Sequence, residues 1–325
     1  MTEPLSLPVF RKISRIVDGM GLRAYVIGGY VRDYYLCRPC TDIDVVVVGS
    51  GIDVAEALAR ETGSNVTVFK TFGTAMLRTE GMEVEFVGAR KESYSRDSRK
   101  PVVEAGTLRD DQLRRDFTIN ALAWSLNGDT FGELEDPFGG MEDMREHIIR
   151  TPCDPDITFS DDPLRMMRAV RFAAQLGFDI APETFEAIER NRERIRIVSR
   201  ERIITEINKI VLSPVPSIGF ELMDMTGLLP LVFPEMSRLK GVEKVGLHGH
   251  KDNFTHTLKV LDNVALNSDS LWLRWAAILH DIGKPATKAY DPAAGWTFHG
   301  HEVVGARMVP DIFRRMKLPL NDRMK

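Results

Sequence analysis

Two aspartates, Asp42 and Asp44, lie at the start of an apolar run, residues 43–48, that has the composition of a β-strand. Successive side chains on a strand alternate between its two faces, so both carboxylates lie on one face, about 6 to 7 Å apart. Both can therefore reach one cluster of divalent cations. Two such cations can activate a 3′-hydroxyl group and hold a leaving pyrophosphate, and Mg²⁺ prefers carboxylate and phosphate oxygens. Either aspartate alone is more typical of a turn or a strand start.

A third carboxylate is available on a second predicted strand, residues 82–87, where Glu83 and Glu85 share one face. Either glutamate could add a ligand to the site of the two aspartates. The alternation of side chains does not by itself choose between them.

Gly28 and Gly29 lie between a predicted strand, residues 24–27, and a predicted helix. Glycine lets the backbone approach a ligand closely, and the amides at a helix start can donate to phosphate oxygens. Taken alone, this segment is better interpreted as a tight turn followed by a surface pair of Arg32 and Asp33. Together with the two aspartates, it favours metal-bound phosphoryl transfer.

Three charged residues, Arg114, Arg115 and Asp116, directly precede an apolar run, residues 117–124. The two guanidinium groups can bind a triphosphate bidentately, and the Asp116 carboxylate can accept a hydrogen bond from a sugar hydroxyl. Such a sugar contact favours ribonucleotides. The alternative is a charged helix start. This interpretation is less favoured because the three charges directly precede an apolar core segment.

Asp162 and Arg165 are three residues apart at the start of a predicted helix, for which Asp161 is the expected cap. They can present an acceptor and a donor side by side. Cytosine and adenine carry an amino group next to an unprotonated ring nitrogen, whereas guanine and uracil carry a carbonyl next to N–H, so the pair fits CTP and ATP. An ordinary salt bridge, worth about 0.2 to 0.5 kcal/mol, is an equally good interpretation. Further nucleotide-binding candidates on this helix are Arg168 and Arg171.

Six of the seven histidines follow residue 242, and three features among them have the spacing of metal ligands. These are His256, then His280 with Asp281 at the end of an apolar run, then the pair His299 and His301. Imidazoles with a carboxylate suit a transition metal or a Mg²⁺-type site that hydrolyses phosphate esters. We therefore predict a second divalent metal site from His256, His280 and Asp281.

The 325 residues favour several domains, and the pattern of elements divides them. Residues 24–135 mix helical segments with short β-branched runs, namely 24–27, 43–48, 65–69, 74–78 and 82–87, whereas amphipathic helices dominate after residue 158. We predict three modules, 1–150, 151–241 and 242–325. The last is short for a self-sufficient helical domain and lacks a closing element, which predicts a fragment of a longer protein.

The charge balance, 43 Lys and Arg against 47 Asp and Glu, gives no overall attraction to nucleic acid or to an anionic membrane. Any polyanion site must be a local patch. The Arg-rich segment 190–202 is a candidate for contact with an RNA backbone, although its interleaved glutamates fit a solvated helix face equally well. No membrane span or signal peptide is indicated, and the three cysteines do not form a disulfide scaffold, so we expect a cytoplasmic protein.

The motifs, taken in order, resemble those of the class II tRNA nucleotidyltransferases (CCA-adding enzymes) and the related bacterial poly(A) polymerases of the polymerase β superfamily. The first motif matches Gly28-Gly29-x-x-Arg32-Asp33 followed by Asp42-x-Asp44, and the second matches residues 114–121. The third matches residues 136–140 with Asp143, a structural turn. The resemblance implies that Asp42 and Asp44 hold Mg²⁺, with Glu85 as the third ligand.

The same resemblance covers the helical region, where Asp162 and Arg165 match the family's base-reading motif Glu-Asp-x-x-Arg. Asp161 stands where the family has Glu, which affects the expected cap rather than the base-reading pair. The last motif, Arg-x-x-x-Glu-x-x-Lys, matches Arg202, Glu206 and Lys209. We expect Arg202 and Glu206, four residues apart, to brace the base-reading helix.

Residues 279–284 are similar to the signature of the HD phosphohydrolase superfamily, some of whose nucleotidyltransferase relatives process 2′,3′-cyclic phosphates. The superfamily's last Asp ligand is expected beyond Lys325, so the site within this chain is predicted to be incomplete.

These observations predict an α+β protein: a polymerase β-like head with a mixed sheet, an all-α neck and a helical HD module. The implied function is template-independent addition of CMP and AMP, from CTP and ATP, to the 3′ end of tRNA. A poly(A) polymerase, an HD-type metal phosphohydrolase and a non-catalytic RNA-binding module are the alternatives. The sequence makes no prediction of the oligomeric state.

Overall fold

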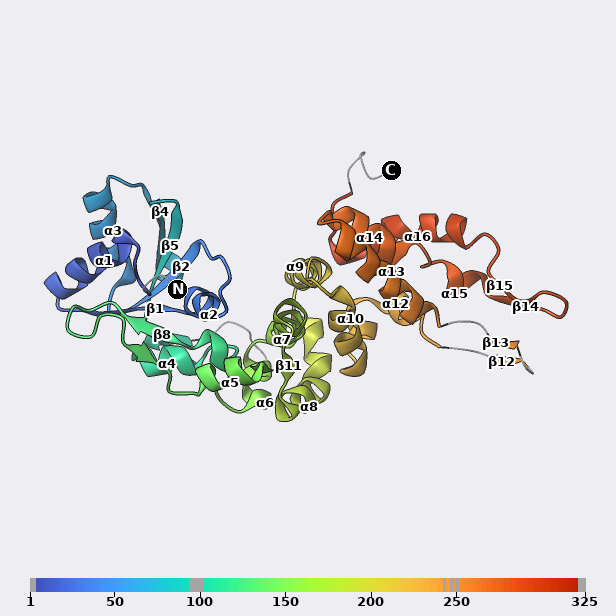
Figure 1. The fold of residues 1–325 in the computed structure, drawn as a ribbon, viewed down its shortest axis with the longest axis horizontal. Coiled ribbons are helices and arrows are strands. Elements are labelled where there is room, and N and C mark those ends of the chain that lie inside the picture. Colours follow the sequence, from blue (N-terminus) through green and yellow to red (C-terminus); the bar gives the residue numbers. More distant parts are fainter. Residues whose placement is uncertain (1–3, 94–101, 242–243, 246–247, 250–251, 321–325) are drawn as a thin grey trace. The chain divides into compact units, whose positions relative to one another are not determined.

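The valine-rich segment that begins with Asp42 forms the central strand of a seven-stranded mixed sheet in the computed structural model (Figure 1). The structure describes residues 4–93, 102–241, 244–245, 248–249 and 252–320. The strand order is β3-β4-β5-β2-β1-β8-β9. The strands are β1 (Arg23–Ile27), β2 (Asp42–Val48), β3 (Val66–Phe69), β4 (Thr74–Thr79), β5 (Met82–Gly88), β8 (Ala123–Ser125) and β9 (Leu134–Glu135).

Strand β2 lies in the middle of the sheet because its valines are apolar on both faces. Val45, Val46 and Val47 are fully buried, and branched side chains of this kind pack well on a pleated surface. Strand β2 pairs antiparallel with β1 and parallel with β5. The five strands predicted in this region are all present, each within two residues of its predicted bounds.

Helices flank this sheet, and two of them begin at residues whose side chains cap them. Helix α3 starts where Ser50 Oγ accepts a hydrogen bond of 3.2 Å from the Asp53 amide, and α4 starts with a capping box of Thr107 and Asp110. The first half of the chain also contains a separate two-stranded sheet, β6 (Arg90–Ser93) with β7 (Val102–Ala105). The helices are α1 (Pro8–Gly19), α2 (Gly29–Tyr35), α3 (Gly51–Thr62), α4 (Leu108–Leu113), α5 (Gly140–Glu146) and α6 (Pro155–Asp161), with the 3₁₀ turns η1 (Lys70–Phe72) and η2 (Thr118–Asn120) and the short strand β10 (Ile148–Ile149).

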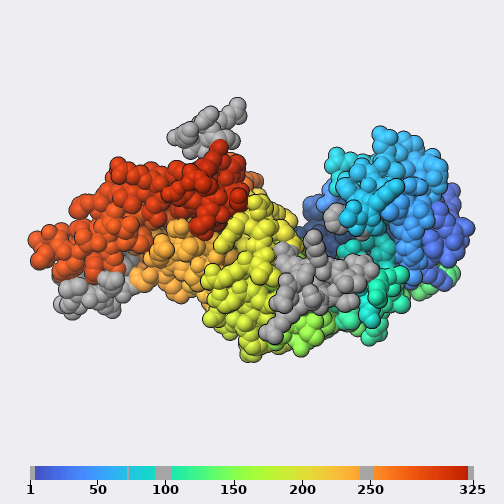
Figure 2. Space-filling view, turned by 180° about the vertical axis from the view of Figure 1, so that it is seen from behind, coloured from blue at the N-terminus to red at the C-terminus, as the bar shows by residue number. Residues whose placement is uncertain are grey.

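The chain forms two compact units, Met1–Asp161 and Asp162–Lys325. In the space-filling view the first unit is coloured blue to green and the second yellow to red (Figure 2). The predicted division into 1–150, 151–241 and 242–325 stays a prediction.

The second unit is built mainly of helices around buried aromatic side chains. Trp275 is 1% exposed and donates from Nε1 to Asn208 Oδ1 at 2.8 Å, so the largest core residue is also hydrogen-bonded. Its helices are α7 (Leu164–Leu176), α8 (Pro182–Asn191), α9 (Arg200–Val211), α10 (Pro216–Met225), α11 (Leu229–Val232), α12 (Pro234–Ser237), α13 (Asn253–Asn267), α14 (Leu271–Leu279), α15 (Lys284–Thr287) and α16 (His301–Met316), with the 3₁₀ turn η3 (Arg192–Ile197).

The predicted α+β class is confirmed, although the helical unit also contains short strands: β11 (Asp179–Ile180), β12 (Lys244–Val245), β13 (His248–Gly249), β14 (Ala289–Asp291) and β15 (Gly295–Thr297). The hairpin of β14 and β15 is closed by Asp291, whose Oδ1 accepts from the amides of Ala293 and Ala294. Among the described residues, no helix combines the length and the apolar composition that crossing a bilayer requires.

Candidate active site

Asp42, Asp44 and Glu85, here called the carboxylate cluster, lie on the paired strands β2 and β5. In this parallel register Asp42 lies opposite Glu83, and Asp44 lies opposite Glu85. Residues opposite each other on adjacent strands project to the same face, so Asp44 and Glu85 are neighbours. Glu83 instead forms an ion pair of 2.7 Å with Arg78. The register therefore supports Glu85 as the partner of the aspartates.

The electrostatics of the carboxylate cluster favour a cation. Burial raises the pKa of the Asp44 carboxyl; the Arg115 guanidinium opposes this shift, and the negative charges of Asp42 and Asp111 add to it. Burial also raises the pKa of Glu85, and the charge of Asp44 adds to that shift. Oxygen ligands that repel one another in this way gain most when a divalent cation binds them, so the residues fit a Mg²⁺-type ion.

The turn at Gly28 lies against this cluster. A Cβ atom at Gly28 would be 2.8 Å from Arg115 Nη1, 3.5 Å from Asp44 Oδ2 and 3.7 Å from the Asn120 carbonyl oxygen. Its φ of +82° also lies in the region that side chains disfavour. Gly29, the first residue of α2, is next to Arg32: its Cβ would lie 3.8 Å from Arg32 Nη2. Glycine at residue 28 thus lets Asp44 and Arg115 approach the same turn.

Arg114 and Arg115 are held by Asp111, which sequence reasoning did not single out. The Asp111 side chain is fully buried; its Oδ1 accepts from Arg114 Nε at 2.9 Å, and its Oδ2 is 3.3 Å from Arg115 Nη2. The available signal was the spacing, because positions three and four residues apart on a helix face each other. Asp111 therefore fixes both guanidinium groups before any nucleotide binds.

Arg32 and Asp116 are fixed by their own partners. Arg32 Nε and Nη2 donate to the two oxygens of Asp33, each at 2.9 Å, and Nη1 donates to Asn120 Oδ1 at 2.7 Å. Asp116 is 7% exposed, and its Oδ1 accepts from the amide of Phe117 at 2.9 Å. The expected pair of Arg32 and Asp33 exists, but both side chains are largely buried rather than on the surface.

The turn that matches the third motif is held by hydrogen bonds, in agreement with a structural role. The Asp136 carboxylate accepts from the amides of Gly140 and Met141 at 2.7 and 3.0 Å, which caps α5. Asp143 accepts from Thr118 Oγ1 at 2.6 Å, which ties α5 to η2 of the second motif.

In the second unit, Asp162 is held at the start of α7. Its Oδ1 accepts from the Leu164 amide at 3.2 Å, so Asp162 supplies the contact that was expected of Asp161, which is the last residue of α6. Its Oδ2 accepts from Arg202 Nη2 at 3.0 Å. Arg165 lies one turn further, with its amide donating to the Asp162 carbonyl at 2.9 Å. Asp162 and Arg165 thus lie at the start of α7 as expected, and a base-reading role of their side chains stays a prediction.

Arg202 and Glu206 of α9 both contact the base-reading helix or the residues at its start, as was expected of them. Arg202 contacts Asp162, whereas Glu206 contacts Arg171 on α7 at 2.5 Å. Arg171 is only 7% exposed and also donates to Gln175 at 2.8 Å. Arg168 has its guanidinium 5.5 Å from the centre of the Phe172 ring. One ion pair therefore joins α9 to α7 and the other joins α9 to the residue that precedes α7 by two positions, between residues 35 to 40 positions apart in the chain.

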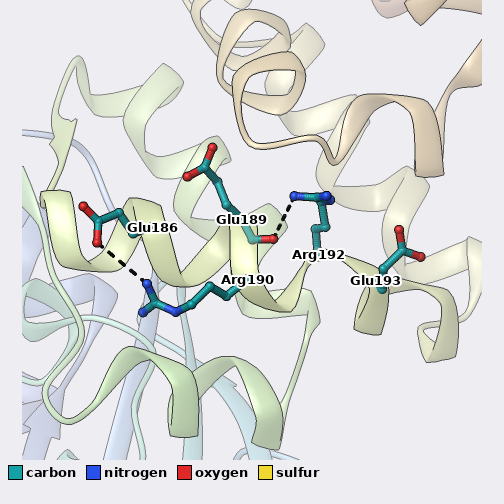
Figure 3. Close-up of a pocket in the computed structure, with 5 residues that line it drawn as sticks. All are labelled: Glu186, Glu189, Arg190, Arg192 and Glu193. Carbon is teal, nitrogen blue, oxygen red and sulfur yellow. Dashed lines mark hydrogen bonds and ion pairs between the residues drawn. The ribbon is translucent and has the colours of Figure 1, made fainter.

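The Arg-rich segment 190–202 begins in the last turn of α8, and three of its arginines contact nearby glutamate residues (Figure 3). Arg190 Nη1 lies 3.7 Å from Glu186 Oε2, and Arg192 Nη1 donates to the Glu189 carbonyl at 3.1 Å. Arg196 Nε donates to Glu193 at 2.8 Å. These contacts agree with a solvated helix face, which was one of the two interpretations of this segment.

His256 on α13 and the pair His280 and Asp281 after α14 form the second cluster, in which one ligand atom from each lies within 4.8 Å of the others. Asp281 Oδ2 is 3.2 Å from His280 Nε2 and 3.6 Å from His256 Nε2, and Asp281 Oδ1 is 3.5 Å from His301 Nε2. We call these four residues the histidine cluster. His301 was recognised by its spacing but not assigned as a ligand, and the packing of α16 brings it to Asp281.

The donor atoms of the histidine cluster suit a divalent metal. His280 Nδ1 is 2.7 Å from the Ala277 carbonyl and His301 Nδ1 is 2.9 Å from the Phe298 carbonyl, so both rings carry hydrogen on Nδ1. Nε2 faces Asp281 in both rings: it donates to that carboxylate when the ring is protonated and can ligate a metal when the ring is neutral. Burial opposes ionisation of Asp281, but hydrogen bonds from His280 and Lys284 outweigh it and lower its pKa to about 2. The hydrogen bond to Asp281 raises the pKa of His280 in turn.

Three family models match the chain in order: the Poly A polymerase head domain over residues 24–150, the probable RNA and SrmB-binding site of polymerase A over 177–240, and the HD domain over 253–324. A multifunctional CCA protein from Pseudomonas fluorescens is 36% identical over 311 residues, which cover 92% of this chain and 71% of that protein. The chain belongs to the family of the CCA-adding enzymes. Another family member, the CCA-adding enzyme of Anoxybacillus flavithermus, is 35% identical over 276 residues, 83% of this chain and 64% of that enzyme.

Solved structures of CCA-adding enzymes share this fold. A tRNA nucleotidyltransferase in complex with a primer tRNA and an incoming ATP analogue has a TM-score of 0.69 at 28% identity and covers 95% of this chain and 80% of that one. A CCA-adding enzyme with CTP has a TM-score of 0.70 at 26% identity and covers 98% and 68%. The resemblance that the motifs indicated is confirmed: this member of the CCA-adding family is a nucleotidyltransferase, and its family uses divalent metals.

Proposed function

We propose that this protein adds CMP and AMP, from CTP and ATP, to the 3′ end of tRNA in a Mg²⁺-dependent reaction. The observation that carries the proposal is the meeting of Asp44, Arg115 and the Gly28 turn, with Glu85 beside Asp44 on the next strand. Relatives that span most of the chain are named for CCA addition, which supports the choice of substrate.

Within the head, each residue has a proposed task. Asp42 and Asp44 hold Mg²⁺, with Glu85 as the third ligand. Bound there, the ion would lower the pKa of the primer 3′-hydroxyl and neutralise charge on the phosphates. Arg115, fixed by Asp111, binds the triphosphate next to the Gly28 and Gly29 turn.

Two further head residues and the start of α7 complete the proposal. Arg32 contacts phosphate, and Asp116 accepts a hydrogen bond from a ribose hydroxyl. Asp162 and Arg165 read the exposed edge of cytosine or adenine, because an acceptor and a donor side by side match both bases. Arg168 is proposed to contact nucleotide, whereas the burial of Arg171 against Glu206 supports a role in holding α7.

Primer extension on a tRNA that ends before CCA, with each nucleoside triphosphate supplied separately, tests this function. We expect wild-type protein to incorporate CMP and AMP but not GMP or UMP. Incorporation of AMP alone would indicate the poly(A) polymerase alternative. The double variant Asp42→Ala with Asp44→Ala should lose addition by several orders of magnitude while staying folded; addition retained by a folded double variant would contradict the proposal. A wild-type chain that binds RNA but adds nothing would indicate a non-catalytic RNA-binding module.

A second activity, hydrolysis of phosphate esters at a divalent metal, is proposed for the histidine cluster. Its support is the convergence of three imidazoles on Asp281. The test is release of nucleoside monophosphate from a 2′,3′-cyclic nucleotide in the presence of Mn²⁺ or Ni²⁺. Activity that survives in the Asp42→Ala, Asp44→Ala variant and disappears in His280→Ala would assign it to this cluster. Absence of release with either metal in wild-type protein would contradict the proposal.

We further propose that the chain consists of three modules, 1–150, 151–241 and 242–325, which is supported by the order of the three family matches. A cytoplasmic location is supported by three cysteines that are all free thiols, Cys37, Cys40 and Cys153, because such thiols are typical of a reducing compartment.

A further inference from the structure

Asn120, the last residue of η2, contacts three of the proposed nucleotide-binding side chains at once. Its side chain accepts from Arg32 Nη1 through Oδ1 at 2.7 Å and donates to Asp116 Oδ1 through Nδ2 at 3.0 Å. Its backbone carbonyl accepts from Arg115 Nη1 at 3.4 Å. Asn120 is 5% exposed, so it is nearly enclosed by these partners.

The chemistry of the two side-chain partners allows one orientation of the amide. A guanidinium group can only donate, and an ionised carboxylate can only accept, so Oδ1 must face Arg32 and Nδ2 must face Asp116. An aspartate in this position would accept from Arg32 but would place a second negative charge against Asp116. An alanine would make neither contact. The amide is thus matched to a cation on one side and an anion on the other.

Each of these two partners is also held from a second direction. Asp33 fixes Arg32 through a pair of hydrogen bonds, and the Phe117 amide fixes Asp116. Asn120 contacts both, and so it links α2, which follows the glycine turn, to the segment of the second motif. Through its carbonyl it also lies beside Gly28, whose Cβ would be 3.7 Å away.

We propose that Asn120 is a positioning residue that sets the Asp116 carboxylate for the ribose hydroxyl and the Arg32 guanidinium for the phosphates. The inference rests on the proposed function, because it assigns Asn120 to the selection of ribonucleotides in that reaction. Asn120 does not contact the nucleotide itself. Its loss lets the Asp116 and Arg32 side chains adopt other orientations, which weakens nucleotide binding and the preference for ribose together.

The experiment compares Asn120→Ala and Asn120→Asp with wild-type protein and with Asn127→Ala as a matched control. Asn127 is a second buried asparagine of the same unit, 3% exposed. Its amide donates to Asp18 and to the Leu22 carbonyl and accepts from the Ala24 amide, so its removal deletes a comparable set of hydrogen bonds outside the proposed nucleotide site. Each full-length variant is assayed for kcat and KM with ATP and with 2′-deoxyATP, and for thermal unfolding.

We expect Asn120→Ala to raise the KM for ATP by about tenfold to a hundredfold, the range that one or two hydrogen bonds to charged groups represent. The preference for ATP over 2′-deoxyATP should fall at least about tenfold. Asn120→Asp should show at least the same loss, because its volume is unchanged but its charge opposes Asp116. Asn127→Ala should lower the melting temperature comparably and keep the ribose preference of wild-type protein.

The inference is wrong if Asn120→Ala and Asn120→Asp keep both the KM and the ribose preference, or if Asn127→Ala loses that preference to the same extent. Should Asn120→Ala fail to fold, Asn120→Asp decides by the same measurements. A wild-type chain that adds no nucleotide contradicts the proposed function instead, and equilibrium dialysis of ATP against wild type and Asn120→Asp then tests the inference separately.

Discussion

The carboxylate cluster and the histidine cluster both gather metal-ligating groups, but they balance charge in opposite ways. In the carboxylate cluster, burial and the neighbouring acids raise the pKa of Asp44 and Glu85. In the histidine cluster, burial opposes ionisation of Asp281, but His280 and Lys284 lower its pKa to about 2. The negative charges of the first cluster therefore gain most from a bound cation, whereas Asp281 in the second cluster is already stabilised by neighbouring cationic side chains. We therefore expect substitution of a head acid to affect nucleotide addition most, and substitution of Asp281 to affect stability most.

The largest expected effect is on catalysis, and it comes from the head. Asp44→Asn keeps the shape of the side chain and removes the charge. We expect nucleotide addition to fall by more than about 10³-fold, because a metal ligand supplies several kcal/mol to the transition state. Thermal stability should be unchanged or higher, since the ionised carboxyl is disfavoured in the folded protein. Primer extension measures nucleotide addition, and thermal unfolding of the same preparation measures stability. Strong destabilisation of Asp44→Asn would contradict the expected difference between the head acids and Asp281.

The matching substitution in the second unit, Asp281→Asn, should give the reverse pattern. This substitution removes the buried negative charge that accepts hydrogen bonds from His280 and Lys284. We therefore expect the free energy of unfolding to fall by about 2 to 4 kcal/mol. Nucleotide addition, measured below the melting transition, should stay within about twofold of wild type. Urea unfolding followed by circular dichroism gives the free energy. Unchanged stability would mean that Lys284 and the histidines do not stabilise this carboxylate.

A smaller effect is expected at the turn of the head. Gly28→Ala adds a Cβ that would lie 2.8 Å from Arg115 Nη1, in addition to an unfavourable φ. Gly63→Ala is the control, because Gly63 has a φ of +65° and no atom within 4 Å of its Cβ position. Both should lose about 1 kcal/mol of stability from backbone strain. Only Gly28→Ala should lose addition, by about tenfold; equal activity of the two variants would show that contact with Arg115 does not matter.

The smallest effect concerns Lys284, whose Nζ is 2.7 Å from Asp281 Oδ2. Lys284→Met removes a cation that competes with a metal for the same oxygen. We expect the affinity of the histidine cluster for Mn²⁺ to rise by about threefold to tenfold, as measured by calorimetric titration of protein that has been treated with a chelator. His280→Ala serves as the reference for lost binding. A lower affinity in Lys284→Met would show that the lysine supports the metal site rather than competing with it.

Local periodicity predicted much of the head. The alternation along β2 placed Asp42 and Asp44 on one face, and the β-branched runs predicted the strands within two residues. The helix start at Asp162 was also predicted, but the residue that caps it was not. A cap depends on the backbone angles of two adjacent residues, and Asp161 and Asp162 are equally suitable by composition.

Contacts between helices were harder to predict. Arg202 and Glu206 were expected to brace the base-reading helix, and they contact Asp162 just before α7 and Arg171 on α7. The sequence did not name these two partners, because a side chain four residues away competes with any partner on a packed neighbour. Only the packing of α7 on α9 decides between them.

Taken alone, the sequence determined the order of the motifs and, through that order, the family. It also determined that Asp42 and Asp44 share one face of a strand. Both results depend on residues that are close together in the chain. The tertiary structure decided which groups from distant parts of the chain become neighbours. In the head, Glu85 lies opposite Asp44 through the register of β2 and β5, Arg115 lies beside Gly28, and Asn120 lies between Arg32 and Asp116. In the second unit, His301 lies beside Asp281. Strand pairing and helix packing join residues that are far apart in the chain, and no local pattern encodes which of the available partners they join.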